Sequence, residues 1–203
     1  MRRSAAATRA KILESAYALF FERGYFRVGV DEIAAAAGIT KRTLYSHFDS
    51  KDALIGAVLQ QQHERAQATI ERWANSLPTA SPAAIDRLFG ELSQWAAKPR
   101  WAGAGFTRIS MELADLRGHP ARVIARKHKQ AVEDRLAQTL GSQQSAVELM
   151  LLLEGTMVML IISGDRRYAE AAAAAAKQLI ANATRTGGAA TPASPAGSRR
   201  RAR

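Results

Sequence analysis

The sequence predicts an all-α protein of about nine helices, in which short N-terminal helices precede longer ones. Apolar residues recur three and four positions apart along most of the chain, as on one face of an α-helix, and strand-type alternation is absent over any useful length. Glycine and proline separate these periodic segments. With 47% apolar residues among 203, the chain has enough apolar surface for a sizeable core, although only 6% of residues are aromatic.

Three short helices are predicted at the start of the chain, over residues 7–23, 31–37 and 41–47. Gly24 and Gly38 follow the first two helices, at the usual place of a helix-ending glycine. The inward face of the first helix is formed by Ile12, Leu13, Ala16, Leu19 and Phe20.

Six further helices follow, and most of them are longer. Ser50 caps a long fourth helix that stops before Pro78, and a loop over 79–82 leads to the fifth. The fifth helix is predicted at about 83–97. Phe106, Ile109 and Leu113 mark a sixth helix that ends near 118–120, and a seventh runs to about Leu140. The eighth and ninth helices are predicted at about 144–163 and 166–184. The helix over 144–163 is apolar nearly all round, which predicts burial on most sides.

Composition excludes several classes of function. The absence of cysteine excludes a disulfide scaffold, a thiolate metal site and a cysteine nucleophile. The four histidines form no close metal-ligand pair, and no nucleophile–base constellation is present, so we expect neither an enzyme nor a metal or other cofactor. The most apolar run, 147–162, is 16 residues long and contains Glu154, too short and polar to span a membrane. These features predict a soluble, cytoplasmic protein.

The net charge of +11 favours an anionic partner, although it is not specific by itself. The segment 185–203 carries five arginines and no acid, in a Gly-, Ala-, Pro- and Ser-rich context that predicts disorder. This basic tail either adds non-specific DNA affinity or is simply a solvated chain end.

The most specific signal lies in residues 30–54, which read as two short helices joined by a tight turn. Ala34 and Gly38 are the small residues that such a turn needs, because a larger side chain at 34 would push the helices apart. Ile33, Ile39, Leu44 and Phe48 are predicted to point inward.

The remaining side chains of the 41–47 helix form an outward set that is cationic, hydroxyl-bearing and aromatic, with no acid between residues 33 and 48. Lysine and arginine reach guanine edges in the major groove, and tyrosine and histidine meet phosphates. An ordinary solvated helix face is the alternative. Because the small-residue turn, the caps and the acid-free face occur together, a DNA-binding face is favoured over an ordinary solvated one.

Residues 8–54 resemble the DNA-binding domain of the TetR family of bacterial transcriptional regulators. The resemblance rests on Phe20, Gly24 and Tyr25 after the first helix, on the GIT-x-x-TLY-x-HF pattern over 38–48, and on Lys51. It implies a three-helix helix-turn-helix domain at 1–52, a C-terminal helical effector-binding and dimerisation domain at 53–184, and the disordered basic tail at 185–203.

The resemblance also implies roles for individual residues. Base or sugar-phosphate contacts fall to Lys41, Arg42, Thr43 and Ser46. Phosphate contacts fall to Tyr45, His47 and Lys51. Gly29 departs from the pattern, because many members have serine or threonine there. It offers no hydroxyl to a phosphate, although its backbone amide could serve.

By the same resemblance, the last two helices pair in a homodimer and the middle helices enclose an effector pocket. A purely monomeric core helix is the alternative for 144–163. The candidate pocket residues are Trp73, Phe89, Leu92, Trp95, Phe106, Ile109, His128 and Glu154. A buried acid needs a partner, and Glu154 could orient a ligand, pair across the dimer or bond a local backbone group.

These features together predict a ligand-responsive regulator, a repressor, that binds an inverted-repeat operator in double-stranded DNA as a homodimer. A small apolar effector would release it. The alternative is a non-specific basic architectural DNA-binding protein. Activation in place of repression stays open, as do the effector and the operator sequence.

Overall fold

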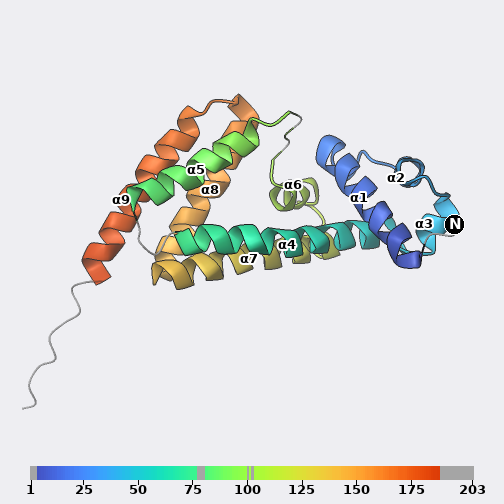
Figure 1. The fold of residues 1–203 in the computed structure, drawn as a ribbon, viewed down its shortest axis with the longest axis horizontal. Coiled ribbons are helices and arrows are strands. Elements are labelled where there is room, and N and C mark those ends of the chain that lie inside the picture. Colours follow the sequence, from blue (N-terminus) through green and yellow to red (C-terminus); the bar gives the residue numbers. More distant parts are fainter. Residues whose placement is uncertain (1–3, 77–80, 100, 102, 188–203) are drawn as a thin grey trace, which may run out of the picture.

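The structure is a computed structural model that describes residues 4–76, 81–99, 101 and 103–187. Within those ranges it is all helical, with no strand. The helices are α1 (Ala5–Arg23), α2 (Val30–Ala37), α3 (Lys41–Tyr45), α4 (Lys51–Ser76), α5 (Pro82–Ala96), α6 (Gly105–Glu112), α7 (Pro120–Leu140), α8 (Gln143–Ser163) and α9 (Arg167–Gly187). The predicted fold class is therefore confirmed: a helix-turn-helix unit precedes a helical domain (Figure 1).

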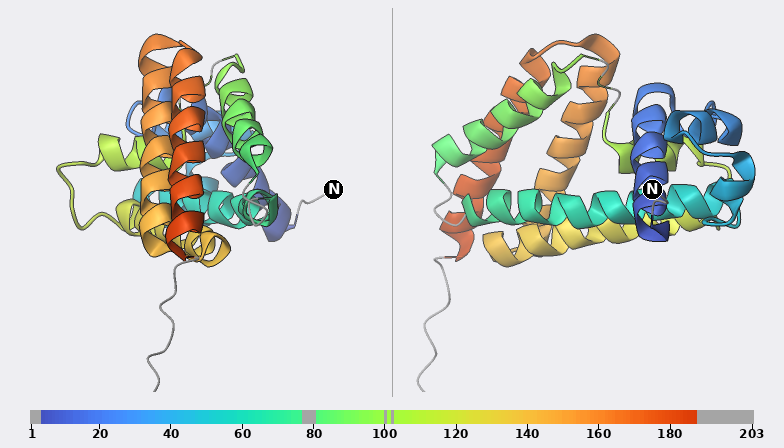
Figure 2. Two further views of the ribbon diagram at one scale, coloured as in Figure 1. Left: turned by 90° about the vertical axis from the view of Figure 1, so that its left-hand side faces the viewer. Right: turned by 45° about the vertical axis from the view of Figure 1, so that its right-hand side comes forward.

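Two apolar cores are arranged along the molecule. The first core joins α1, α2 and α3 to the start of α4 and to α6 and α7; Ile12, Ile33, Leu44 and Leu54 are all 0% exposed in it. The second core lies among α5, α7, α8 and α9. Helices α4 and α7 run side by side beneath both (Figures 1 and 2), so a displacement at one core can reach the other through them.

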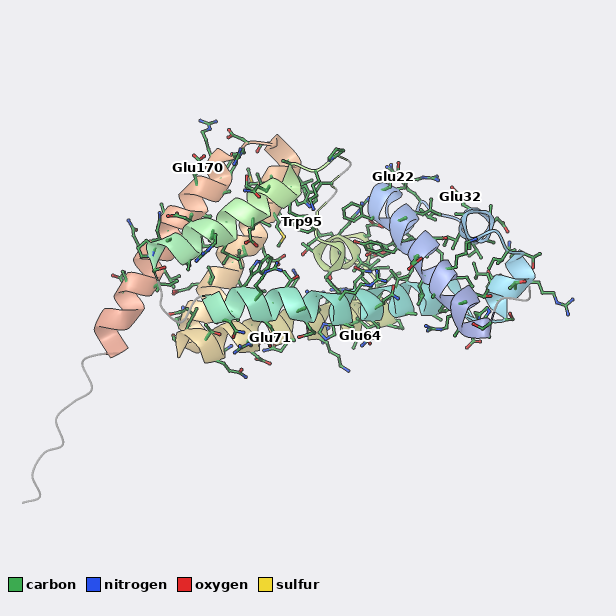
Figure 3. All side chains as sticks on the ribbon, viewed as in Figure 1. Glu22, Glu32, Glu64, Glu71, Trp95 and Glu170 are labelled. Atoms are coloured by element: carbon green, nitrogen blue, oxygen red, sulfur yellow. The ribbon has the colours of Figure 1, made fainter. Side chains whose placement is uncertain are left out.

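Polar contacts fix the register of α4 on α7. Arg135 of α7 donates from Nε to Glu71 Oε2 at 3.0 Å and from Nη2 to Asn75 Oδ1 at 2.7 Å, both on α4. Figure 3 shows Glu71 on this pair of helices, well away from the helix-turn-helix unit.

Local capping sets most helix ends. The Ser4 hydroxyl accepts a hydrogen bond from the Ala7 N–H, so α1 begins earlier than residue 7. Pro82, predicted in a loop, is instead the first residue of α5, where its missing N–H costs nothing and Ser81 caps the helix. Helix α9 continues to Gly187, into the segment for which the sequence predicts a disordered tail; 188–203 lie outside the described residues.

Helix α8 is not buried on most sides, contrary to its all-round apolar sequence. Leu151 and Ile162 are 69% and 70% exposed, on the face away from the second core. At 21 residues and mean hydropathy 1.9, α8 has the length and composition of a membrane-crossing helix. It packs against α5, α7 and α9 through its other face.

Candidate DNA interface and ligand cavity

The turn between α2 and α3 is stabilised by a left-handed glycine. Gly38 has φ +62° and ψ +42°, a left-handed backbone conformation that residues with a Cβ rarely adopt. Its N–H donates to Ala35 O at 2.9 Å, and the Ile39 N–H donates to Ala34 O at 3.0 Å. The Thr40 hydroxyl then accepts from Thr43 N at 3.1 Å and caps α3. Both ends of the turn are therefore fixed by hydrogen bonds, and α3 is held against α2.

The predicted DNA-contacting residues on α3 fall into two groups. Arg42 and Tyr45 are exposed, and Tyr45 is 42% exposed despite its large ring. Lys41 is also exposed but pairs with Asp31 Oδ2 of α2 at 3.0 Å. The hydroxyls of Thr43 and Ser46 are engaged locally, with Thr40 Oγ1 at 2.9 Å and with Thr43 O at 2.7 Å.

Helix α3 is shorter than predicted, because its last turn tightens. The Ser46 hydroxyl bonds back to Thr43 O, and the His47 N–H donates to Leu44 O three residues earlier. This geometry ends the regular helix at Tyr45 and leaves His47 half-buried.

Lys51 lies at the start of α4 beside the loop that follows α1. Its Nζ donates to Phe26 O at 3.2 Å and lies 6.0 Å from the centre of the exposed Phe26 ring. Partial burial lowers its pKa. The Gly29 N–H, which could have met a phosphate, donates to Glu32 Oε1 at 3.0 Å. A phosphate there would have to displace Glu32.

Two basic residues of α1 also lie beside this surface, and the sequence pattern does not single them out. The Arg9 guanidinium lies 5.0 Å from the centre of the Phe48 ring, just after α3. Lys11 Nζ lies 3.3 Å from the position that a Cβ on Gly38 would take, at the α2–α3 turn. Both residues are visible in the sequence, but their place beside α3 depends on how α1 crosses the turn between α2 and α3.

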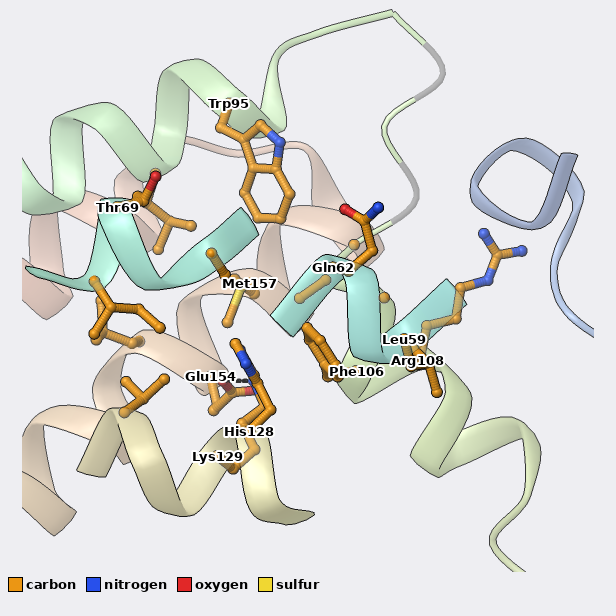
Figure 4. A pocket seen from close by; sticks show the side chains of 18 of the residues that line it. Leu59, Gln62, Thr69, Trp95, Phe106, Arg108, His128, Lys129, Glu154 and Met157 are labelled. Atoms are coloured by element: carbon orange, nitrogen blue, oxygen red, sulfur yellow. Dashed lines mark hydrogen bonds and ion pairs between the residues drawn. The ribbon is translucent and has the colours of Figure 1, made fainter. Parts of the chain in front are cut away.

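A cavity of about 240 Å³ lies between the two cores (Figure 4). Six of the predicted pocket residues line it: Trp73, Leu92, Trp95, Phe106, His128 and Glu154. Phe89 and Ile109 do not. They are 1% and 0% exposed inside the second and first cores, because the rotation of α5 and α6 turns them away from the cavity. Four residues from α1 and its following loop also line the cavity: Tyr17, Phe20, Phe21 and Tyr25.

Glu154 is held on the cavity wall by two neighbours within the same chain. Lys129 of α7 donates to one carboxylate oxygen, and the Thr107 hydroxyl of α6 donates to the other at 2.7 Å. The pair with Lys129 neutralises the carboxylate, and the three residues join α6, α7 and α8. Both partners are side chains of the same chain, not a local backbone group.

His128 lies between an aromatic ring and a second histidine. Its ring stacks on Phe106 with centroids 3.7 Å apart and planes at 12°. Its Nδ1 is 3.0 Å from His63 Nδ1, and Gln67 Nε2 lies 3.1 Å from His63 Nε2. Burial, Lys129 and His63 lower the pKa of His128 to about 3, so the ring is neutral at physiological pH.

The cavity is connected to the helix-turn-helix unit by an ionic latch, formed by Arg108 and Glu112 of α6. The Glu112 carboxylate accepts from Tyr25 N at 2.9 Å and from Phe26 N at 3.2 Å. It also accepts from Arg108 Nε at 3.0 Å, while Arg108 Nη1 donates to Phe21 O at 2.9 Å. From sequence, Arg108 and Glu112 form only an i,i+4 surface pair; their reach to α1 depends on the fold.

Residues 12–58 match the family model described as bacterial regulatory proteins, tetR family. This match runs from within α1 through α2 and α3 into the start of α4, and so includes the helix-turn-helix unit. The chain carries a TetR-family DNA-binding domain. The predicted resemblance to the TetR family is thereby confirmed.

Several curated transcriptional regulators match a quarter to two fifths of the chain. The chain is 41% identical over 68 residues to the regulator UidR of Escherichia coli K12, covering 34% of this chain and 35% of UidR. It is 39% identical over 80 residues to the repressor DhaR of Mycobacterium sp. GP1, and 49% over 53 residues to the activator FasR of Mycolicibacterium smegmatis. These matches cover 39% of each chain for DhaR, and 26% of this chain and 24% of FasR. The chain thus spans about a third of the length of the curated relatives it matches first.

The whole TetR-family fold is shared with solved structures. A TetR-family regulator from Streptomyces coelicolor superposes with TM-score 0.73 at 23% identity, covering 88% of this chain and 97% of that one. The reduced form of Escherichia coli NemR gives 0.72 at 23% identity, covering 85% and 97%. A regulator from Streptomyces avermitilis gives 0.66 at 28%, covering 83% and 97%. The likeness therefore extends through the C-terminal helices.

Proposed function

We propose that the protein is a cytoplasmic, ligand-responsive transcriptional repressor that binds an inverted-repeat operator as a homodimer. The observation that carries the proposal is the shared cavity wall: α1 of the DNA-binding unit and the bundle helices line one cavity. A ligand that binds there meets the DNA-binding unit directly. The name of DhaR supports repression, whereas that of FasR keeps activation as the alternative.

DNA recognition is assigned to the exposed side of α3. Arg42 is free of local ion pairs in the described structure and would contact base edges. Tyr45 and Lys51 flank it and would contact phosphates, which position the helix without reading sequence. In a two-fold dimer the two copies of α3 would enter successive major grooves, about 34–36 Å apart or a little more.

Dimerisation is assigned to the outward face of α8 together with α9. Leu151 and Ile162 are large exposed apolar side chains on α8, and between them in sequence a Cβ added to Gly155 would meet nothing within 4 Å. A pairing surface with a central glycine permits close helix approach.

Gly155→Arg tests this assignment, since it adds bulk and charge where the single chain has open space. We expect monomers by analytical ultracentrifugation, with helicity unchanged. Gly90→Arg is the matched control, because Gly90 on α5 is also open to added atoms. Dimers that persist in Gly155→Arg would place the interface elsewhere.

Ligand release of DNA would proceed through the latch and α4. A ligand that fits the cavity better in one conformation than another shifts the population toward it. Movement of α6 changes the hold of Glu112 on the loop after α1, and movement of α4 carries Lys51 with it. Either displacement changes the spacing of the two α3 copies.

Selection of bound fragments from random DNA tests the proposal as a whole. We expect an enriched inverted repeat. In gel shifts, Tyr45→Ala and Lys51→Ala should weaken specific and non-specific binding alike, while Arg42→Ala should also relax base preference. Arg87→Ala, an exposed arginine on α5, is the control for lost positive charge.

Two outcomes would contradict the proposal. No enriched sequence, with affinity lost when 188–203 are removed, would identify a non-specific basic DNA binder. Unchanged binding by all three variants would remove α3 from the interface.

A further inference from the structure

The charges around the cavity are already balanced by the protein. Three residues of charged type line the cavity: Arg108, Lys129 and Glu154. Lys129 and Glu154 neutralise each other, and Arg108 is engaged by Glu112 and Phe21 O. His128 is neutral, since burial depresses its pKa. A charged ligand would leave water without gaining an opposite charge, which is unfavourable.

The size and lining of the cavity indicate a small aromatic ligand. Its volume of about 240 Å³ is roughly 1.6 times the ~150 Å³ apolar cavity that holds benzene, close to the ratio of ring carbons in naphthalene to benzene. Trp95, Phe106 and His128 offer ring faces and edges, which favour stacked or edge-on aromatic partners.

Among the buried side-chain nitrogen and oxygen atoms of the described cavity wall, one has no hydrogen-bond partner. Gln62 of α4 lines the cavity, and its Nε2 is buried without a hydrogen-bond partner. A buried N–H without a partner costs free energy and is rarer than an under-satisfied buried oxygen, so a ligand acceptor that reaches Gln62 Nε2 would remove that cost. Figure 4 shows Gln62 and Glu154 at separate places on the wall, so Gln62 does not draw on the Glu154 pair.

We propose that the cavity binds an uncharged aromatic compound of one or two fused rings that carries a hydrogen-bond acceptor, which Gln62 Nε2 engages. This inference rests on the proposed function only in taking the cavity as the effector site. It excludes carboxylate and ammonium ligands. The chain has no cysteine, so the ligand is not bound covalently through a protein thiol.

Isothermal titration calorimetry on the full chain without DNA tests the proposal with four probes. Quinoline and naphthalene differ by one ring nitrogen, an acceptor that is uncharged at neutral pH. N-methylquinolinium and 1-naphthoate supply a cation and an anion of similar size. The variants are Gln62→Leu and, as control, Gln60→Leu, whose side chain faces away from the cavity and bonds Glu64.

We expect the quinoline-to-naphthalene affinity ratio to fall about 5-fold in Gln62→Leu, the effect of one lost neutral hydrogen bond, and to stay unchanged in Gln60→Leu. Both charged probes should bind at least about 10-fold more weakly than quinoline. Equal ratios in the parent and Gln62→Leu overturn the proposal, and so does tight binding of either ion or failure of both uncharged probes.

The same probes separate this inference from the proposed function. Quinoline that binds the chain but leaves its selected DNA fragment bound in gel shifts would refute the release mechanism while the ligand class stands. Release of DNA by 1-naphthoate, and by neither uncharged probe, would refute the ligand class while the release mechanism stands.

Discussion

Replacing Glu112 with alanine should uncouple the cavity from the DNA-binding unit and destabilise the fold. Three hydrogen bonds are lost, from Tyr25 N, Phe26 N and Arg108 Nε, at 2.9, 3.2 and 3.0 Å. Two of them leave backbone N–H groups without an acceptor. At roughly 1 kcal/mol for each backbone bond and less for the partly exposed ion pair, the free energy of unfolding should fall by about 2–3 kcal/mol.

Urea unfolding followed by circular dichroism measures this loss directly. Glu112→Gln keeps one acceptor oxygen and should lose about half as much, which preserves a folded sample for further work. Asp115→Ala removes an exposed acid just beyond α6 and should change the free energy by less than ~0.5 kcal/mol. On a selected DNA fragment, Glu112→Gln should show a smaller ligand-induced loss of affinity than the parent. Equal stability of Glu112→Ala and Asp115→Ala would refute the latch.

Two further changes test local features. Gly38→Ala should destabilise by about 1 kcal/mol in urea unfolding because φ is +62°, and Gly38→Asn by less, since asparagine tolerates that region; equal losses would contradict the reasoning. His128 has a folded pKa of about 3, below its unfolded value near 6.5, so protons bind preferentially to the unfolded chain as pH falls. Between pH 7 and 5 the parent should lose about 2 kcal/mol more stability than His128→Gln, and parallel pH profiles would show that His128 titrates normally.

Local signals allowed the helices to be predicted closely. Helix ends are set at the glycine after α2, at the Thr40 cap and at Gly141. Each of these residues acts on backbone groups only a few positions away, so its effect can be predicted from the sequence. The end of α3 was predicted two residues late, because the back-bonding of the Ser46 hydroxyl competes with the helical pattern.

The cavity could be predicted only in part. Aromatic residues at helical spacing indicated its general lining, but Phe89 and Ile109 lie in the cores and Gln62 lies on the wall. Spacing identifies which residues share a helix face; it does not give the rotation of that face toward a cavity or a core. That rotation is set by how neighbouring helices fill space.

The sequence by itself determined the helical class, the helix-turn-helix unit and the cationic, acid-free face of α3, because caps, turn residues and periodicity act over short distances along the chain. Tertiary structure alone determined that Glu112 holds the loop after α1, that Lys129 and Thr107 hold Glu154, and that α1 lines the cavity. Those contacts join residues far apart in the chain. They exist only where packing of the two cores brings their helices together.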